Sequence, residues 1–282
     1  MHPPDQKTSY TSNKAKHLHT VTDSFGMVSL PDGVLWGAQT ARSLHFFAIG
    51  EQRMPADIIH ALALIKWAAA CVNGELNLQK PAVAHAIATA SNRVAAGEFD
   101  DQFPLSVWQT GSGTQSNMNV NEVIASLASE ELDEGTNFDH KIHPNDDVNL
   151  GQSSNDVFPT AMHLAVGLKV KTTLLPALDE LMNALATKAL EFESIIKIGR
   201  THLQDAAPLS LGQEMSGWVA QLDHAHGVIE RAAKPLCELA IGGTAVGTGQ
   251  NTHPAFGERV AARLSERLSV PQGKTLKVAH NR

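Results

Sequence analysis

Four short segments of the sequence combine small, hydroxyl, amide and imidazole side chains more densely than packing requires. The first, residues 110–117, has two glycines beside the hydroxyls of Ser112 and Thr114 and then leads into a helical pattern. Glycines let backbone N–H groups converge on an anion, and neighbouring hydroxyls add donors. Taken alone, however, this segment is better explained as an ordinary turn that caps a helix.

Another polar segment, residues 152–156, stands immediately before a long apolar pattern. Its Ser153, Ser154 and Asn155 therefore fall at the expected start of a helix, where the macrodipole favours a carboxylate. Simple capping would need only one of these side chains. Together they indicate a carboxylate-binding site at a helix N-terminus.

A third segment, residues 143–149, begins with His143 and Pro144 and contains Asn145 and Asp146. A turn started by proline and closed by an Asx hydrogen bond is its better explanation. A metal site would need a second His or Glu at ligand spacing, which the segment lacks. We therefore expect no metal.

The fourth segment, residues 199–205, carries Thr201 and His202 between two long apolar lattices. An imidazole can titrate near neutral pH and so could move a proton. A lone histidine in a loop is usually just solvated, so the segment by itself decides nothing.

Helices are expected to position these segments. Apolar residues recur at steps of four and three over residues 58–76, and Pro81 opens a second apolar stretch that Gly97 closes. Two longer lattices predict antiparallel helices over about residues 156–196 and 208–236, the first with a kink at Pro176.

A glycine-rich stretch, residues 242–249, follows the second long lattice, and a third helix is expected from Phe256 to about Leu268. Two long helices and one short one make a poor bundle, because a pair buries only one stripe of each member. The pattern thus indicates an incomplete long-helix bundle.

The composition favours an all-α protein: aromatic residues are 5% of the chain, and Ala and Leu recur throughout. Against 29 Asp+Glu there are 22 Lys+Arg, a formal charge of -7, so no broad basic field exists to hold nucleic acid. A dianion must then be bound locally, by hydroxyls, amides, a few cations and helix N-termini.

The remaining sequence features exclude several classes of protein. Cys71 and Cys237 are far apart, so neither a disulfide framework nor a thiolate metal site is indicated. The longest apolar stretch, residues 61–72, contains Lys66 and is too short to cross a bilayer, so no membrane partner is expected. Residues 1–20 are polar without an apolar core, which predicts a disordered leader and, by default, a cytoplasmic protein. The alternative is an organellar transit peptide, against which the lack of Arg and of an amphipathic face argues.

Taken together, the four polar segments resemble the fumarase/aspartase superfamily, and the resemblance to class II fumarases is close from Gly26 to about Val270. The strings that carry it appear in family order with near-family spacing: residues 36–40 (WGAQT), 108–114 (WQTGSGT), 143–146 (HPND), 152–156 (QSSND) and 199–202 (GRTH). The resemblance implies an all-α fumarase/aspartase-like fold, with a small helical N-terminal domain followed by a long-helix bundle.

Sister enzymes remain as alternatives. Aspartate ammonia-lyases typically carry Gln where this chain has His202 and Thr where it has Ser154, so both positions favour a fumarase. Argininosuccinate and adenylosuccinate lyases share the fold but not the run of residues 114–119 (TQSNMN). A non-catalytic fragment that only associates with a partner is a second alternative.

By resemblance, the chain would be a fumarate hydratase of the tricarboxylic acid cycle that converts fumarate to malate without a cofactor, as a homotetramer. His202 would orient or activate water with help from Thr201. The residues implied in binding the substrate carboxylates are Ser112, Thr114, Ser153, Ser154 and Asn155. A peripheral dicarboxylate site is implied at His143, Asn145 and Asp146.

The chain departs from the family at two places. His140 stands where the family usually has Arg, which puts anion binding at the peripheral site in doubt. Residues after 270 no longer follow the family, and the loop that carries the catalytic base serine is not present, so we expect a truncated chain that is inactive alone. The expected divisions are a leader (1–20), an N-terminal lyase domain (21–152), a partial central bundle (153–268) and a divergent tail (269–282).

Overall fold

The computed structural model describes residues 18–135, 141–269 and 275–279. Its helical elements are α1 (Ala38–Phe46), α2 (Ala56–Glu75), α3 (Pro81–Ala95), η1 (Asp100–Gln102), α4 (Thr114–Gly135), η2 (Pro144–Val148), α5 (Ser154–Lys169), η3 (Val170–Leu174), α6 (Leu175–Glu191), α7 (Leu211–Ala233), η4 (Lys234–Cys237) and α8 (Phe256–Arg267). Its strands pair antiparallel as β1 (Leu18–Asp23) with β2 (Gly26–Pro31) and β3 (Ile196–Thr201) with β4 (Gln204–Ser210), and parallel as β5 (Glu238–Leu239) with β6 (Lys277–Val278). The expected helical fold is confirmed.

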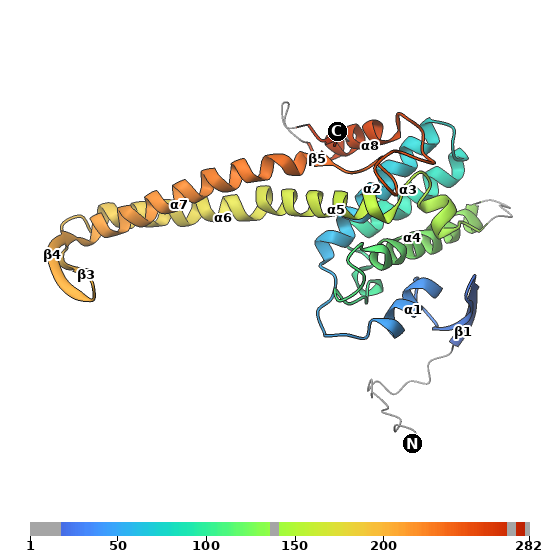
Figure 1. Cartoon of the computed structure of the whole chain (residues 1–282), viewed down its shortest axis with the longest axis horizontal. Helices are drawn as coiled ribbons and strands as arrows, with labels where there is room; N and C mark the ends of the chain where they lie inside the picture. Colours follow the sequence, from blue (N-terminus) through green and yellow to red (C-terminus); the bar gives the residue numbers. More distant parts are fainter. Residues whose placement is uncertain (1–17, 136–140, 270–274, 280–282) are drawn as a thin grey trace, which may run out of the picture.

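Helix α2 lies at the centre of a compact body, with α3, α4, α5 and α8 around it (Figure 1). It is long and apolar enough to cross a membrane by length and composition, but most of that window is buried inside the protein. Buried aliphatic side chains from the surrounding helices form one continuous core with it, from Ile59 in α2 to Leu264 in α8. The helices expected over residues 58–76 and from Pro81 are both present.

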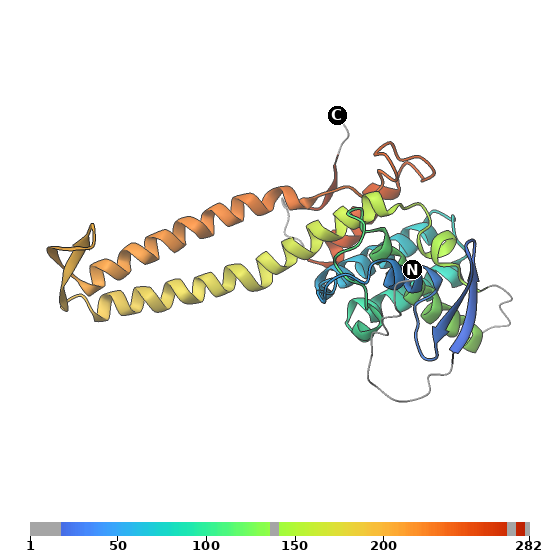
Figure 2. The same ribbon diagram turned by 60° about the horizontal axis from the view of Figure 1, so that its bottom comes forward.

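Helices α6 and α7 leave this body side by side as a long antiparallel pair, and the β3–β4 hairpin forms its far tip (Figures 1 and 2). On α6, the half-buried positions include Leu178, Met182, Leu185 and Ala189, which are members of the expected lattice. On α7 the expected apolar stripe is less completely buried, because its member Trp218 is 44% exposed.

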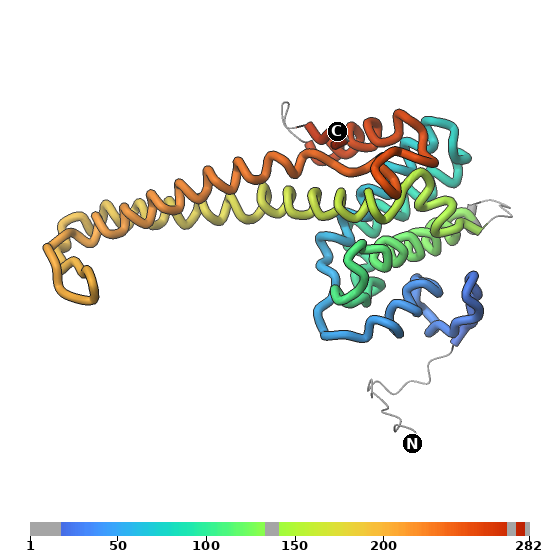
Figure 3. Tube along the Cα trace, viewed as in Figure 1, coloured from blue at the N-terminus to red at the C-terminus, as the bar shows by residue number. Residues whose placement is uncertain are grey.

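Near Pro176 the long first helix changes from α to π geometry. The N–H of Leu175 donates to the carbonyl of Val170, five residues back, and α6 then continues from Leu175. Proline lacks an N–H and its ring crowds the preceding turn, so a widened turn accommodates it. The irregularity expected at Pro176 is therefore a π segment inside a continuous rod, as the tube view shows (Figure 3).

The ends of the long helices differ from the expected 156–196 and 208–236, because α6 stops at Glu191 and α7 starts at Leu211. A β-hairpin occupies the connection, which is rich in β-branched residues such as Ile196 and Ile198. Ser210 then starts α7 with a capping box: its side chain accepts from the Gln213 N–H at 3.0 Å. Tertiary pairing of the hairpin overrides the helical period at both ends.

The structure also differs from the expectations for residues near the two ends of the chain. Residues 1–17 lie outside the described part, but Leu18–Asp23 form strand β1, so the last three positions of the expected leader are structured. Helix α8 packs against α2 in the body rather than beside α6 and α7. In the expected tail, Leu276 is buried in the core and Lys277–Val278 extend β5 as a parallel partner.

Candidate active site

Two helix N-termini meet at the hydroxyl-rich segments. Thr114 is the first residue of α4 and Ser154 the first residue of α5, and their hydroxyl oxygens lie 2.9 Å apart. Ser112 extends the chain of hydroxyls, with its oxygen 3.1 Å from that of Thr114. Two positive helix ends and three rotatable hydroxyl donors thus converge on one place, which suits a carboxylate. We call Ser112, Thr114 and Ser154 the hydroxyl cradle.

Gly113 gives the cradle its shape. Its φ of +69° lies in the left-handed region, and an added Cβ would come within 2.2 Å of the Phe158 ring on α5. Only glycine allows α4 to begin this close to α5. The glycine in the first polar segment therefore brings the two helices together, which a simple cap would not require.

Residues before and inside the first turn of α5 complete this region. Ser153 caps the helix: its hydroxyl accepts from the Asn155 N–H at 3.3 Å, and its own N–H donates to Asp156 Oδ1 at 2.9 Å. Ser153, Ser154 and Asn155 thus sit at a helix N-terminus, as predicted. Asn155 already donates its amide to the carbonyl of Ala245 at 2.7 Å.

Asp156 ties this first turn to the glycine-rich loop, residues 242–249. Its Oδ2 accepts from the N–H groups of Gly242 and Thr244 at 3.0 and 2.9 Å. Burial raises the pKa of Asp156, although these backbone donors and Lys66 act in the opposite direction. No role beyond the string that contains it was assigned to Asp156 from the sequence.

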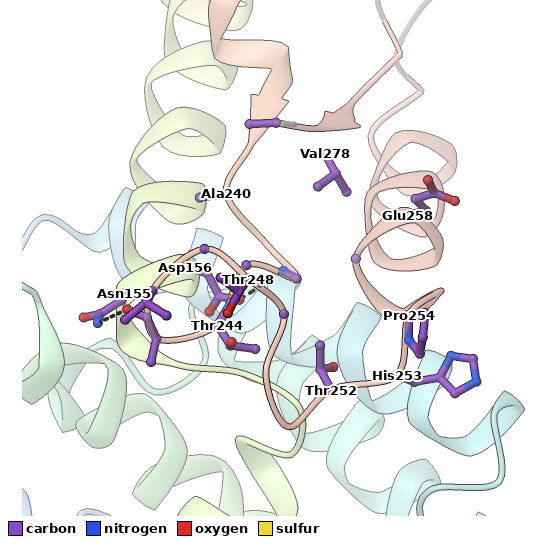
Figure 4. Close-up of a pocket in the computed structure, with 18 residues that line it drawn as sticks. Asn155, Asp156, Ala240, Thr244, Thr248, Thr252, His253, Pro254, Glu258 and Val278 are labelled. Atoms are coloured by element: carbon purple, nitrogen blue, oxygen red, sulfur yellow. Dashed lines mark hydrogen bonds between the residues drawn. The ribbon is translucent and has the colours of Figure 1, made fainter. Parts of the chain in front are cut away.

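A cavity of about 570 Å³ opens beside this loop (Figure 4). Its walls come from Asn155 and Asp156, the glycine-rich loop, the start of α8 and Val278. Thr244 is 7% exposed, and its hydroxyl is buried without a hydrogen-bond partner among the described residues. The first turn of α5 therefore borders an open space as well as the cradle.

Lys66 on α2 lies beside the connection that leads into α5, and it was assigned no role from the sequence. Its side chain is completely buried in α2, and its ammonium donates to Asn149 Oδ1 at 2.7 Å and Gln152 Oε1 at 2.9 Å. Burial lowers the pKa of Lys66 to about 7, opposed by the charge of Asp156. The only sequence signal was a lysine interrupting an otherwise apolar stretch.

Thr201 and His202 are not brought to the cradle within one chain. They lie at the turn of the β3–β4 hairpin, where His202 and Leu203 both have positive φ, 47° and 62°. Figures 1 and 2 show this turn at the far end of the α6–α7 pair from α4. The helical run from Ser154 to Glu191 alone is roughly 55 Å long at about 1.5 Å per residue.

The turn that begins at His143 is a separate, exposed feature. His143 Nδ1 accepts from the Asp146 N–H at 3.1 Å, and Asn145 Nδ2 donates to Asp146 Oδ1 at 3.0 Å. The His143 N–H donates to Asp147 Oδ2 at 2.8 Å, so two carboxylates crowd this turn. His140, on which the family comparison depended, lies outside the described residues.

The model of a lyase family matches residues 26–281 of the chain. The chain belongs to this lyase family. The chain is also similar to two curated proteins named fumarate hydratase class II. The one from Chromobacterium violaceum is 56% identical over 91% of this chain and 56% of that protein, and the one from Nitrosomonas europaea is 57% identical over 88% and 54%.

The fold has a solved counterpart among these lyases. The crystal structure of a recombinant class II fumarase from Schistosoma mansoni superposes with a TM-score of 0.85 at 47% identity, covering 90% of this chain and 53% of that one. The chain thus spans about half the length of the lyases it matches. Within the described residues, no group of three His, Cys, Asp or Glu side chains could hold a metal ion.

Proposed function

We propose that this chain forms part of a class II fumarate hydratase, in which its hydroxyl cradle binds a carboxylate of fumarate or malate. The observation that carries the proposal is the meeting of α4 and α5 at the hydroxyls of Thr114 and Ser154, 2.9 Å apart. This arrangement suits an anionic ligand in a chain whose net charge is -7. The relatives named fumarate hydratase supply the reaction.

The chemistry of hydration explains why such a cradle is useful. Water adds a hydroxyl to one alkene carbon and a proton to the other, and in the reverse direction removal of that proton pushes electrons into the adjacent carboxylate. The resulting aci-carboxylate group carries two negative charges and is stabilised by preorganised donors. In this proposal the cradle, Ser153 and Asn155 hold the carboxylates, while His202 orients or activates the water and Thr201 assists.

The distance between the hydroxyl cradle and the β3–β4 hairpin, which carries His202, requires more than one copy of the chain at each site. Because the α6–α7 pair is long and paired along its length, the hairpin of one chain cannot fold back onto its own cradle. We place His202 of one copy against the cradle of another, in a homotetramer of the kind implied by the resemblance. A cytoplasmic location belongs to the same proposal.

The peripheral site is a second part of the proposal. His143, Asn145 and Asp146 are together on one turn, but Asp146 and Asp147 make its surroundings acidic. A dicarboxylate bound there would rely on donors from the His143 imidazole and the Asn145 amide against these like charges.

Mixed assembly tests the proposed function directly. The chain is co-expressed with the full-length Chromobacterium violaceum relative in which the histidine corresponding to His202 is replaced by Asn. If the chain donates His202 to the relative's cradle, fumarate hydration is restored. The His202→Asn chain should not restore it, whereas His224→Asn, a change of the same type at an exposed position on α7, should.

Two results would argue for the alternatives. If the mixed assembly deaminates aspartate and does not hydrate fumarate, the chain would be better explained as part of an aspartate ammonia-lyase. A mixed oligomer that forms but restores no turnover with the unchanged chain would favour a fragment that only associates.

A further inference from the structure

Lys66 is buried without a full counter-charge. Its side chain is 0% exposed, and it takes part in none of the ion pairs among the described residues, although the charge of Asp156 acts on it. Its hydrogen-bond partners are the side-chain oxygens of Asn149 and Gln152. Burying an ammonium in this way is costly, and an apolar residue in the middle of α2 would pack without that cost. Such an arrangement calls for a role other than packing.

The two acceptors lie on the connection that leads into α5. An ammonium only donates hydrogen bonds, so both side-chain oxygens must face it, and this fixes which end of each amide points away. The amino end of Asn149 donates to the Gln152 carbonyl at 3.2 Å, and that of Gln152 donates to the Val148 and Leu150 carbonyls at 3.2 Å. Lys66 therefore determines the path of the chain from Val148 to Gln152.

Both helices of the cradle depend on this path. Gln152 is followed directly by Ser153 and Ser154, and Asn117 in the first turn of α4 donates to Asn149 Oδ1 at 3.2 Å. One buried ammonium is thus connected through Asn149 to α4 and through Gln152 to α5. A small shift of either amide would change how Thr114 and Ser154 face each other.

We propose that Lys66 is a positioning residue of the dicarboxylate site, which holds the two helix N-termini together through Asn149 and Gln152 and places a positive charge behind them. This inference rests on the proposed function, because it assumes that the cradle binds a dicarboxylate. In this role Lys66 supplies the local cation that an acidic chain needs to bind a dianion.

The role of the Lys66 charge can be tested by varying the pH. Asp156 on α5 is the charged group that acts on it, and its hydrogen-bond partners are the neutral amides Asn149 and Gln152. From α4, the neutral amide of Asn117 donates to the same Asn149 oxygen. Burial holds the pKa of Lys66 at about 7, so the ammonium loses its proton as the pH rises through neutrality. Binding of a dianion should weaken over the same range.

The test is a fumarate titration of the full chain, followed by NMR at the backbone amides of Thr114 and Ser154. At pH 6 we expect Lys66→Met to weaken fumarate binding by about tenfold or more, which corresponds to about 1.4 kcal/mol. Lys188→Met is the matched control, because it removes an exposed lysine that pairs with Glu191 far from the cradle, with the same change in net charge. It should leave the affinity unchanged.

A second measurement needs no change at Lys66. Between pH 6 and pH 8.5 fumarate remains a dianion, and its affinity for the unchanged chain should fall several-fold because Lys66 loses its charge. Because exposed His253 lines the neighbouring cavity, the series is repeated with His253→Asn as a control, which should keep the dependence. Lys66→Met should abolish it.

The outcomes separate this inference from the proposed function. Equal affinities for the unchanged chain and Lys66→Met, or an affinity that does not change with pH, would overturn the role of Lys66 and leave the cradle intact. If fumarate shifts no amide of the unchanged chain at any pH, the cradle itself is not a dicarboxylate site, and the inference falls with it. If Lys66→Met does not fold, the pH series on the unchanged chain decides.

Discussion

The Glu122 carboxylate on α4 accepts a hydrogen bond from the Thr40 hydroxyl at 2.6 Å and another from the Thr40 N–H at 3.1 Å. It also accepts from the N–H groups of Gly37 and Gln39 at 2.9 and 2.8 Å. One buried side chain therefore satisfies the free donors at the N-terminus of α1. This gives the WGAQT string a structural role in attaching α1 to α4.

Replacing Glu122 by Ala should destabilise the protein by about 3 kcal/mol, because several N–H groups of α1 would lose their acceptor. Glu122→Gln should cost less, since one oxygen remains. Urea unfolding followed by circular dichroism measures both, with Glu180→Ala on the exposed face of α6 as control. A loss for Glu122→Ala no larger than for Glu180→Ala would show that α1 does not depend on this carboxylate.

Gly113→Ala should disrupt the cradle. The substitution combines a positive φ with a clash against the Phe158 ring, so we expect a loss of about 2 kcal/mol or more in the free energy of unfolding. Gly111→Ala, two residues earlier, meets nothing within 4 Å and should change stability by less than about 0.5 kcal/mol. Similar losses at the two positions would contradict the close approach of α4 and α5.

Lys66 should make stability depend on pH above neutrality. Its folded-state pKa is about 7 against an ordinary 10.5, so in this window the unfolded chain carries the extra proton and the free energy of unfolding rises with pH. The slope is at most about 1.4 kcal/mol per pH unit. From pH 7.5 to 9.5, the unchanged chain should therefore gain about 2 kcal/mol more than Lys66→Met does in urea unfolding. Identical gains would mean that Lys66 titrates normally.

The purified chain by itself should consume no measurable fumarate. Its hydroxyl cradle lies in the helical body, whereas His202 lies at the turn of the β3–β4 hairpin, at the far tip of the α6–α7 pair (Figure 1). A positioned group for proton transfer typically supplies about 10²–10⁴ in rate, and one lost donor to the developing charge costs roughly another 10²–10³. Fumarate absorbance, with protein freed of host fumarase, measures this. Turnover within about tenfold of a full-length relative would refute the expectation.

Local rules predicted most of the helical elements and the start of the site. Apolar spacing located α2, α3 and α8 because one buried stripe repeats with the helical period. Ser153 before an apolar lattice indicated the cap of α5 because capping needs only neighbours in sequence. The ends of α6 and α7 were misplaced because the hairpin between them is stabilised by cross-strand pairing.

The sequence by itself determined the helical class, the polar segments and their resemblance to a lyase family, since these follow from residue types and short spacings. Only the tertiary structure decided which segments meet. It joined Thr114 to Ser154, connected buried Lys66 to both helices through Asn149 and Gln152, and carried His202 to the far end of the α6–α7 pair. Contacts between residues 40 or more positions apart depend on how helices pack, and no local pattern in the chain encodes that geometry.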